Sequence, residues 1–214
     1  MRRRIFALAL ATAIAPLVSS FAVGRDDNGV AFFTKLRMDY AKRPDFDPRW
    51  EDHEERKKIT DLWSAGKIDE GMGLAEQWLI KHPVDAKMQL WYAFFLRKKG
   101  DFQGYFRHRH LYQGLLASIS SSGTGLSPDS PMKVISVSEE YTVLRDLGAK
   151  LKQQALLTNE AGTPCDRMEC ELEGKSITLY FDVTISMEHT RRSLLNPKTE
   201  DRPPSDKPKE GEGK

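Results

Sequence analysis

Apolar residues in the first half of the chain recur at the spacing of amphipathic helices. Over residues 51–119 they fall on the faces of successive helices, and the clearest sets are Ile68, Met72, Ala75 and Leu79, then Met88, Trp91, Tyr92, Phe95 and Leu96. An earlier helix is predicted through Phe33, Leu36 and Tyr40, ahead of Pro44 and Pro48, which cannot continue it. The pattern therefore predicts a helical region over residues 30–119.

Two segments of this helical region align with each other. Gly66 and Gly100 fall together at a separation of 34 residues, which is the period of the tetratricopeptide helical hairpin. Pro83 closes the first unit and Asp85 is placed to start the next helix, but Tyr105 stands where the motif usually has a small residue. The sequence thus resembles the motif without fulfilling it, and it predicts two helical hairpins over residues 51–119.

After residue 123 the apolar pattern changes to that of strands. Residues 132–137 predict a buried strand, and a helix follows with Ser138 as its N-cap and Gly148 as its end. Further strands are predicted over residues 151–157, 166–172 and 176–185, the last from the alternation of Ile177, Leu179, Phe181, Val183 and Ile185 with polar residues. The predicted fold class is α+β: tetratricopeptide-like hairpins, then a small domain (residues 123–187) of one strand, one helix and a three-strand antiparallel meander.

The two ends of the chain read as segments outside the fold. Arg2, Arg3 and Arg4 precede an apolar run over residues 5–18, and small residues before Ala22 suit signal peptidase, so residues 1–22 are predicted to be a signal peptide cut near Ala22. An uncleaved anchor is the alternative. Residues 190–214, rich in charge and proline, are predicted to be a disordered tail. The expected location is periplasmic or secreted.

The net charge of the chain without its leader limits the kinds of partner that are expected. The chain has 33 Lys and Arg against 31 Asp and Glu, and loss of the three leader arginines leaves 30 against 31. Nucleic-acid binding requires clustered positive charge, so nucleic acid is not an expected partner. No stretch after the leader has the run of about 20 apolar residues that a membrane span requires.

Cys165 and Cys170 raise the question of a disulfide, because an exported protein meets an oxidising compartment. On a strand over residues 166–172, Met168, Cys170 and Leu172 share one face, so Cys165 points away from Cys170. This spacing argues against pairing. A disulfide here would instead mean that residues 164–170 form a loop.

A succession of short motifs resembles one protein family. They are Leu36-x-x-x-Tyr40, Pro44, Asp47-Pro48, Gly123-x-Gly125-x-Ser127-Pro128, the block from Val134 through Glu139-Glu140-Tyr141 to Gly148, and Leu179-Tyr180-Phe181-Asp182-Val183. Over about residues 33–187 the chain resembles the bacterial exported family called Domain of Unknown Function 4919. The resemblance implies an export signal, helical hairpins followed by a small sheet domain, and no assigned activity.

Each conspicuous motif has a structural and a chemical interpretation. Gly123, Gly125 and Ser127 could cradle a phosphate, but a nucleotide loop follows a strand and opens a helix, whereas this one follows a helix and opens a strand. Glu139 and Glu140 could be a general acid and base, yet neighbours on a helix diverge, and acids in a first helical turn favour the helix dipole. A turn and a helix cap are therefore the preferred interpretations.

The histidines predict neither a metal site nor a cofactor site. His108 and His110 are two positions apart (i and i+2), so they diverge on a helix, and His53, His82 and His189 are scattered. No metal and no cofactor is expected.

Aromatic residues gather in the second hairpin. Their density predicts either a sealed helix interface or a groove in which Tyr92, Tyr105 and Arg109 bind a peptide or protein, since aromatics and Arg dominate binding hot spots. The leading hypothesis is a non-enzymatic protein-interaction module of the bacterial envelope, whose partner is a protein or peptide. The alternative is a cell-envelope hydrolase that uses Glu140 and Tyr141.

Overall fold

The computed structural model describes residues 27–195, so the predicted signal peptide and most of the predicted tail lie outside the described residues. The helical region comprises α2 (Asp27–Ala41), the short 3-10 helix η2 (Trp50–Asp52), α3 (Glu54–Ser64), α4 (Ile68–Lys81), α5 (Ala86–Lys98) and α6 (Phe102–Ser120). The remainder comprises β1 (Met132–Lys133), α7 (Val137–Leu147), β2 (Lys150–Thr158), β3 (Pro164–Leu172), β4 (Lys175–Asp182) and α8 (Thr184–Leu195). The predicted α+β class is confirmed.

Two helical hairpins, α3–α4 and α5–α6, contain turns that repeat the same backbone geometry. Gly66 and Gly100 both have positive φ, at 77° and 81°. The backbone N–H of Lys67 donates to the Leu62 carbonyl at 2.9 Å, and that of Asp101 donates to the Leu96 carbonyl at 3.0 Å. Because each residue of this turn has its equivalent 34 positions later, the spacing read from the sequence corresponds to a repeated structural unit.

The second hairpin begins at a buried cap. Asp85 is the N-cap of α5 and accepts a hydrogen bond from the Met88 backbone N–H at 3.0 Å, as expected for a helix start. The same carboxylate accepts from Arg56 Nε at 2.7 Å and from Trp78 Nε1 at 3.0 Å. One side chain therefore joins α3, α4 and α5.

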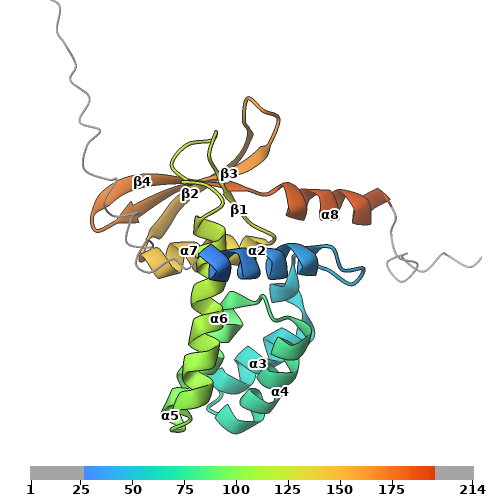
Figure 1. Ribbon diagram of the computed structural model, residues 1–214, viewed down its shortest axis with the longest axis vertical. Helices are drawn as coiled ribbons and strands as arrows, with labels where there is room; N and C mark the ends of the chain where they lie inside the picture. Colours follow the sequence, from blue (N-terminus) through green and yellow to red (C-terminus); the bar gives the residue numbers. More distant parts are fainter. Residues whose placement is uncertain (1–26, 196–214) are drawn as a thin grey trace, which may run out of the picture.

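The four strands form one sheet in the order β1-β4-β3-β2. Strands β2, β3 and β4 are the predicted antiparallel meander, and β1 pairs with β4 in parallel, with Met132 opposite Phe181. Figure 1 shows the sheet at one end of the molecule and the helical hairpins at the other, with α7 between them. The buried apolar residues of both parts belong to one continuous cluster.

The predicted end of the last strand is wrong. Strand β4 stops at Asp182, and Thr184 and Ile185 begin α8, which runs to Leu195. The Asp182 carboxylate accepts from the Thr184 backbone N–H at 3.0 Å and from its hydroxyl at 2.5 Å, so it turns the chain out of the sheet. Residues 190–195, predicted to be part of the disordered tail, are therefore helical.

Both cysteines are buried free thiols on β3, as their spacing predicted. Cys165 lies opposite Asp182 and Cys170 opposite Ile177 in the ladder with β4. Residues five apart on a strand face opposite sides of the sheet, which keeps the two thiols apart.

Candidate functional site

The start of α7 differs from the prediction by two residues. Ser136, not Ser138, is the N-cap, and its hydroxyl accepts from the Glu139 backbone N–H at 3.3 Å. The Glu139 carboxylate reaches back to the Ile135 backbone N–H at 2.8 Å, which resembles a capping box. The predicted strand over residues 132–137 is correspondingly short, because this cap ends it.

Glu139 is held in a buried ion pair with Arg37 of α2. Arg37 donates through Nε to one carboxylate oxygen at 2.8 Å and through Nη2 to the other at 2.5 Å. Its remaining donors reach the Ser118 hydroxyl and the Lys133 carbonyl, each at 3.0 Å. This bidentate pair satisfies both charges and joins α2, α6, β1 and α7, so it explains Glu139 without any chemistry.

Glu140, the next residue, has no such partner. Its side chain is 0% exposed, and neither carboxylate oxygen receives a hydrogen bond from a donor in residues 27–195. Burial raises the pKa of Glu140 to about 9, and the charges of Asp166 and Glu139 add to the shift. Glu140 is thus a neutral acid at pH 7, and the prediction that it favours the helix dipole as a carboxylate is wrong.

Asp166, whose charge acts on Glu140, is linked to the surface through two further side chains, Gln154 and Tyr141. The Asp166 carboxylate on β3 accepts from Gln154 Nε2 at 2.7 Å, and Gln154 Oε1 accepts from the Tyr141 hydroxyl at 3.1 Å. Burial, followed by the charges of Glu140, Asp166 and Glu51, raises the pKa of Tyr141, whose ring is 44% exposed. We call Glu140, Tyr141, Gln154 and Asp166 the Glu140 cluster.

The Glu140 cluster contains one feature of a general acid and lacks another. Two adjacent carboxyl groups share a site in which one of them keeps its proton, as in enzymes that separate acid and base roles. However, the structure leaves Glu140 fully buried and Asp166 only 9% exposed, so no substrate atom reaches Glu140 in this conformation. The arrangement can keep a proton on Glu140.

Sequence reasoning missed Asp166 and Gln154. Asp166 lies on the same face of β3 as the buried residues Met168 and Cys170. A carboxylate on this inward face could have been noticed in the sequence. Gln154 carries no comparable signal, because it lies on an edge strand whose residues are mostly exposed.

Tyr92 is not available to the predicted groove of Tyr92, Tyr105 and Arg109, because its side chain is buried. Tyr92 is only 7% exposed and packs edge-on against His108, with ring centroids 4.7 Å apart. Tyr105 is covered by the Arg97 guanidinium, 5.6 Å from its ring centroid. Burial of Tyr92 in the hairpin separates it from the exposed surface that a groove requires.

Other aromatic side chains of the same hairpin do face outward. Phe94, Phe102 and Phe106 are 50%, 58% and 66% exposed. Phe102 and Phe106 lie one turn apart on α6, and Lys98 Nζ lies 4.6 Å from the ring centroid of Phe94. We call these three phenylalanines the hairpin aromatic surface. This surface could have been recognised in the sequence from Phe102 and Phe106, which lie one helical turn apart directly after the N-cap Asp101.

The glycine motif holds a loop against the sheet. Gly125, at φ 67°, donates its N–H to the Ser130 carbonyl at 2.8 Å and accepts from the Tyr180 N–H at 2.9 Å. A side chain at Gly123 would come within 2.1 Å of the Pro131 carbonyl oxygen. The Ser127 carbonyl accepts from the Ser130 N–H, so these backbone groups bond within the loop. Gly148 ends α7 at φ 73°, as expected.

The histidine pair of α6 is used in packing. His108 Nδ1 lies 2.6 Å from Gln89 Oε1, and the His110 ring packs against Phe33 at 5.6 Å. Across residues 27–195, His, Cys, Asp and Glu side chains form no group of three or more that could hold a metal ion. None of the helices between Asp27 and Leu195 is long and apolar enough to cross a membrane.

These features define an α+β protein in which two repeated helical hairpins join a four-stranded sheet through buried charged side chains. The chain belongs to the family described as Domain of unknown function (DUF4919), whose model matches residues 30–192. The family resemblance read from the motifs is confirmed. No curated protein and no solved structure matches the chain.

Proposed function

We propose that this protein is a non-enzymatic binding module of the bacterial envelope, and that the α5–α6 hairpin contacts a protein partner. The observation that carries the proposal is the hairpin aromatic surface, in which three phenylalanines remain 50% or more exposed. Several exposed large apolar side chains on one helical hairpin are typical of interaction sites. The apolar leader, the near-neutral charge without it and the resemblance to tetratricopeptide hairpins support the location and the mode of binding.

The charge of the hairpin indicates the chemistry of the partner. Residues 86–120 contain six Lys and Arg against a single carboxylate, the helix cap Asp101: Lys87, Arg97, Lys98, Lys99, Arg107 and Arg109. Cations beside aromatic rings, such as Lys98 at Phe94 and Arg97 at Tyr105, are common in binding hot spots. The partner is therefore an acidic protein surface with an apolar centre.

A site-specific crosslinking experiment tests the proposal. A photoreactive residue replaces Phe106 in one strain and Ile80, an apolar residue that is 77% exposed on α4, in a control strain. The proposal expects one acidic protein to be captured through position 106 and not through position 80. That protein is then purified and titrated against wild type and against the variant Phe94→Ser/Phe102→Ser/Phe106→Ser.

The expected loss follows from the apolar area that the three rings would bury. Each phenylalanine is worth about 1.5 kcal/mol or more when fully buried, so the triple variant binds at least about 100-fold more weakly. Binding also weakens with added salt, because the hairpin is basic. Equal affinity of the variant and wild type, with unchanged thermal unfolding of both, would contradict the proposal.

The alternative function is a cell-envelope hydrolase, and the Glu140 cluster is the observation that favours it. A carboxyl group with pKa of about 9 next to a second carboxyl group matches the division between a general acid and a base. An enzyme of this kind loses activity on a cell-wall substrate when Glu140 becomes Gln, whereas Glu139→Asp, at the neighbouring ion pair, keeps activity while the protein stays folded. If the wild-type protein is inactive on glycan and peptide cell-wall polymers, this alternative is wrong.

A further inference from the structure

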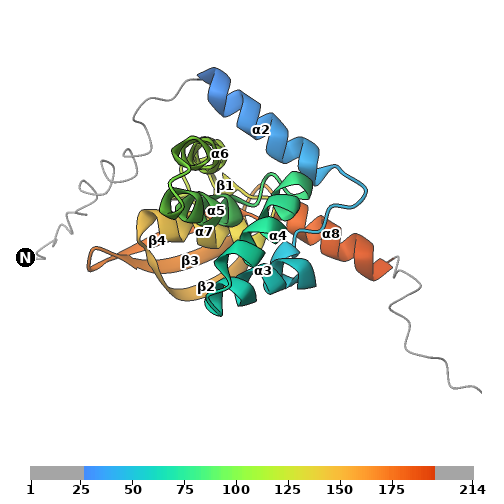
Figure 2. The same cartoon turned by 90° about the horizontal axis from the view of Figure 1, so that it is seen from below.

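A cleft lies between the end of α2 and α8, away from the α5–α6 hairpin. Its volume is about 550 Å³, within the range of about 300–1,000 Å³ that is usual for small-molecule sites. Met38 and Ala41 of α2, Phe46 of the following loop and Ile185 of α8 give it apolar walls. Figure 2 shows α8 beside the loop that follows α2.

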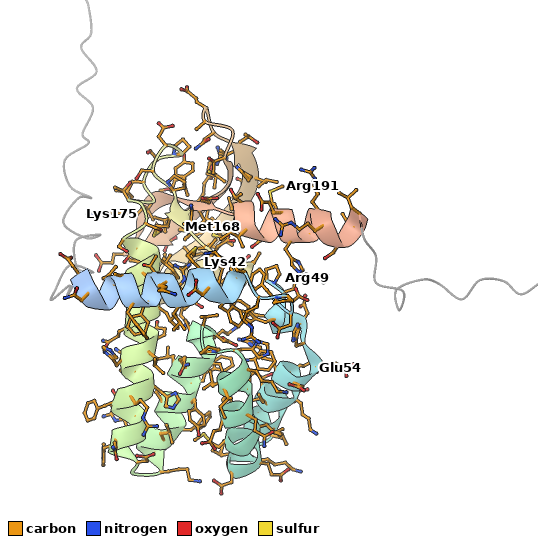
Figure 3. The ribbon with its side chains drawn as sticks, turned by 45° about the vertical axis from the view of Figure 1, so that its right-hand side comes forward. Lys42, Arg49, Glu54, Met168, Lys175 and Arg191 are labelled. Carbon is orange, nitrogen blue, oxygen red and sulfur yellow. The ribbon has the colours of Figure 1, made fainter. Side chains whose placement is uncertain are left out.

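The rim of the cleft is mostly cationic. Lys42, Arg43 and Arg192 line it, and Glu188 is the one carboxylate among the lining residues. Arg43 is already paired with Asp45 at 2.6 Å. Glu188 is already engaged by Arg192 at 3.3 Å. Two other basic residues labelled in Figure 3, Arg49 and Arg191, do not line the cleft, and Arg191 points away from α2. A cation-rich rim over apolar walls is complementary to a molecule with an anionic head and an apolar body.

His189 supplies a polar group that the fold does not use. It lines the cleft, its ring packs edge-on against Phe46 at 5.6 Å, and its Nδ1 atom is buried without a hydrogen-bond partner in residues 27–195. Buried polar atoms in folded proteins almost always have a partner. The ring nitrogen is buried behind the wall of the cleft, so a ligand bonds to it once the His189 ring turns toward the cleft.

We propose that the α2–α8 cleft binds a small carboxylic acid with an apolar body, held by Lys42 and Arg192 at the rim and by His189 Nδ1 within. The apolar walls take the hydrocarbon part, and the ring nitrogen donates its proton to a carboxylate oxygen. This site is separate from the hairpin aromatic surface, so it is independent of the protein-binding function proposed above.

Calorimetric titration with octanoate tests the proposal, and octyltrimethylammonium, with the same chain and the opposite charge, is the matched ligand control. Wild type binds octanoate at least about 10-fold more tightly than the ammonium analogue. The imidazole nitrogen resonances of His189 shift on octanoate addition. Absence of octanoate binding, or equal affinity for the two ligands, overturns the proposal.

Two variants locate the site. Ala41→Trp fills the cleft from its α2 wall and abolishes octanoate binding, whereas Ile80→Trp, at an exposed position of α4, leaves binding unchanged. Arg192→Glu, at a side chain that is 78% exposed, keeps the fold and weakens binding at least about 5-fold. If Arg192→Glu and Ala41→Trp both bind octanoate as wild type does, the ligand lies elsewhere and the assignment of the cleft is wrong.

Discussion

Replacing Glu140 by glutamine removes an ionisable group from the core without changing its shape. The structure predicts that this change stabilises the protein at neutral pH. Glu140 is fully buried, and its pKa rises from the ordinary value of 4.5 to about 9, first because of burial and then because of Asp166. Glutamine has no charge to desolvate, and its amide is close in size and shape to the protonated acid.

The size of the effect follows from proton linkage. Between pH 4.5 and about 9 the folded state keeps a proton on Glu140 that the unfolded state has released. Stability contributed by this group is therefore complete below pH 4.5, falls by about 1.4 kcal/mol per pH unit as the pH rises, and is lost above about pH 9. At pH 7 the glutamine variant is more stable than wild type by up to about 3 kcal/mol, and the difference vanishes toward pH 4.5.

Urea unfolding followed by tryptophan fluorescence, repeated from acidic to mildly alkaline pH, measures this difference. Trp50, Trp63 and Trp78 are buried and report unfolding of the core. The matched control is Glu139→Gln, the same chemical change at the preceding residue. It destabilises by about 3–5 kcal/mol at pH 7, because Arg37 is left buried and unpaired. A Glu140→Gln variant that is less stable than wild type at pH 7, or shifted equally at every pH, would refute the desolvation argument.

Packing also determines the expected results of two glycine substitutions and of one thiol-labelling experiment. Gly114→Ala places a methyl group 2.0 Å from the Phe33 ring and destabilises by about 1–3 kcal/mol, as measured by urea unfolding. Gly73→Ala, in an exposed part of α4 with no atom within 4 Å of the new methyl, stabilises by about 0.5–1 kcal/mol in the same assay. Burial raises the pKa of Cys165 and Cys170, so both thiols react with a chromogenic disulfide only after urea is added; fast labelling of native protein would contradict their burial.

Local patterns predicted most of the elements. The helical hairpins follow from apolar spacing, and the turns follow from Gly66 and Gly100, whose positive φ is a local requirement. The end of β4 was mispredicted because Val183 and Ile185 continue the alternation of a strand, while Asp182 accepts from Thr184, the first residue of the following helix. An Asp that can form such a turn was visible in the sequence, but the alternation gave the stronger signal.

The site depends on contacts that no local pattern contains. Arg37 and Glu139 are 102 residues apart, and Arg37 lies on a helix face otherwise marked by Phe33 and Tyr40. Glu139 and Glu140 are indistinguishable as neighbours in the sequence, yet one meets a guanidinium and the other meets a carboxylate. Tertiary packing decides which of these two adjacent acids is charged. The sequence could therefore predict that a helix is capped here, but not which of the two acids keeps its proton.

The buried ion pair between Arg37 and Glu139 is better explained by orientation than by stability. Replacing buried pairs with apolar residues of similar volume is often neutral or stabilising. What Arg37 adds is direction, because one planar group bonds at once to Glu139 of α7, Ser118 of α6 and the Lys133 carbonyl of β1. Only one placement of the helical region against the sheet satisfies all three contacts.

The double variant Arg37→Met/Glu139→Leu separates these two roles. It is expected to unfold within about 1–2 kcal/mol of wild type, since no charge is left unpaired. Its amide resonances in α2, α6 and α7 are expected to broaden, because apolar side chains permit more than one packing of these helices. Sharp, wild-type-like spectra in the double variant would show that apolar packing alone sets the orientation. The position of the hairpin aromatic surface relative to the sheet would then owe nothing to this ion pair.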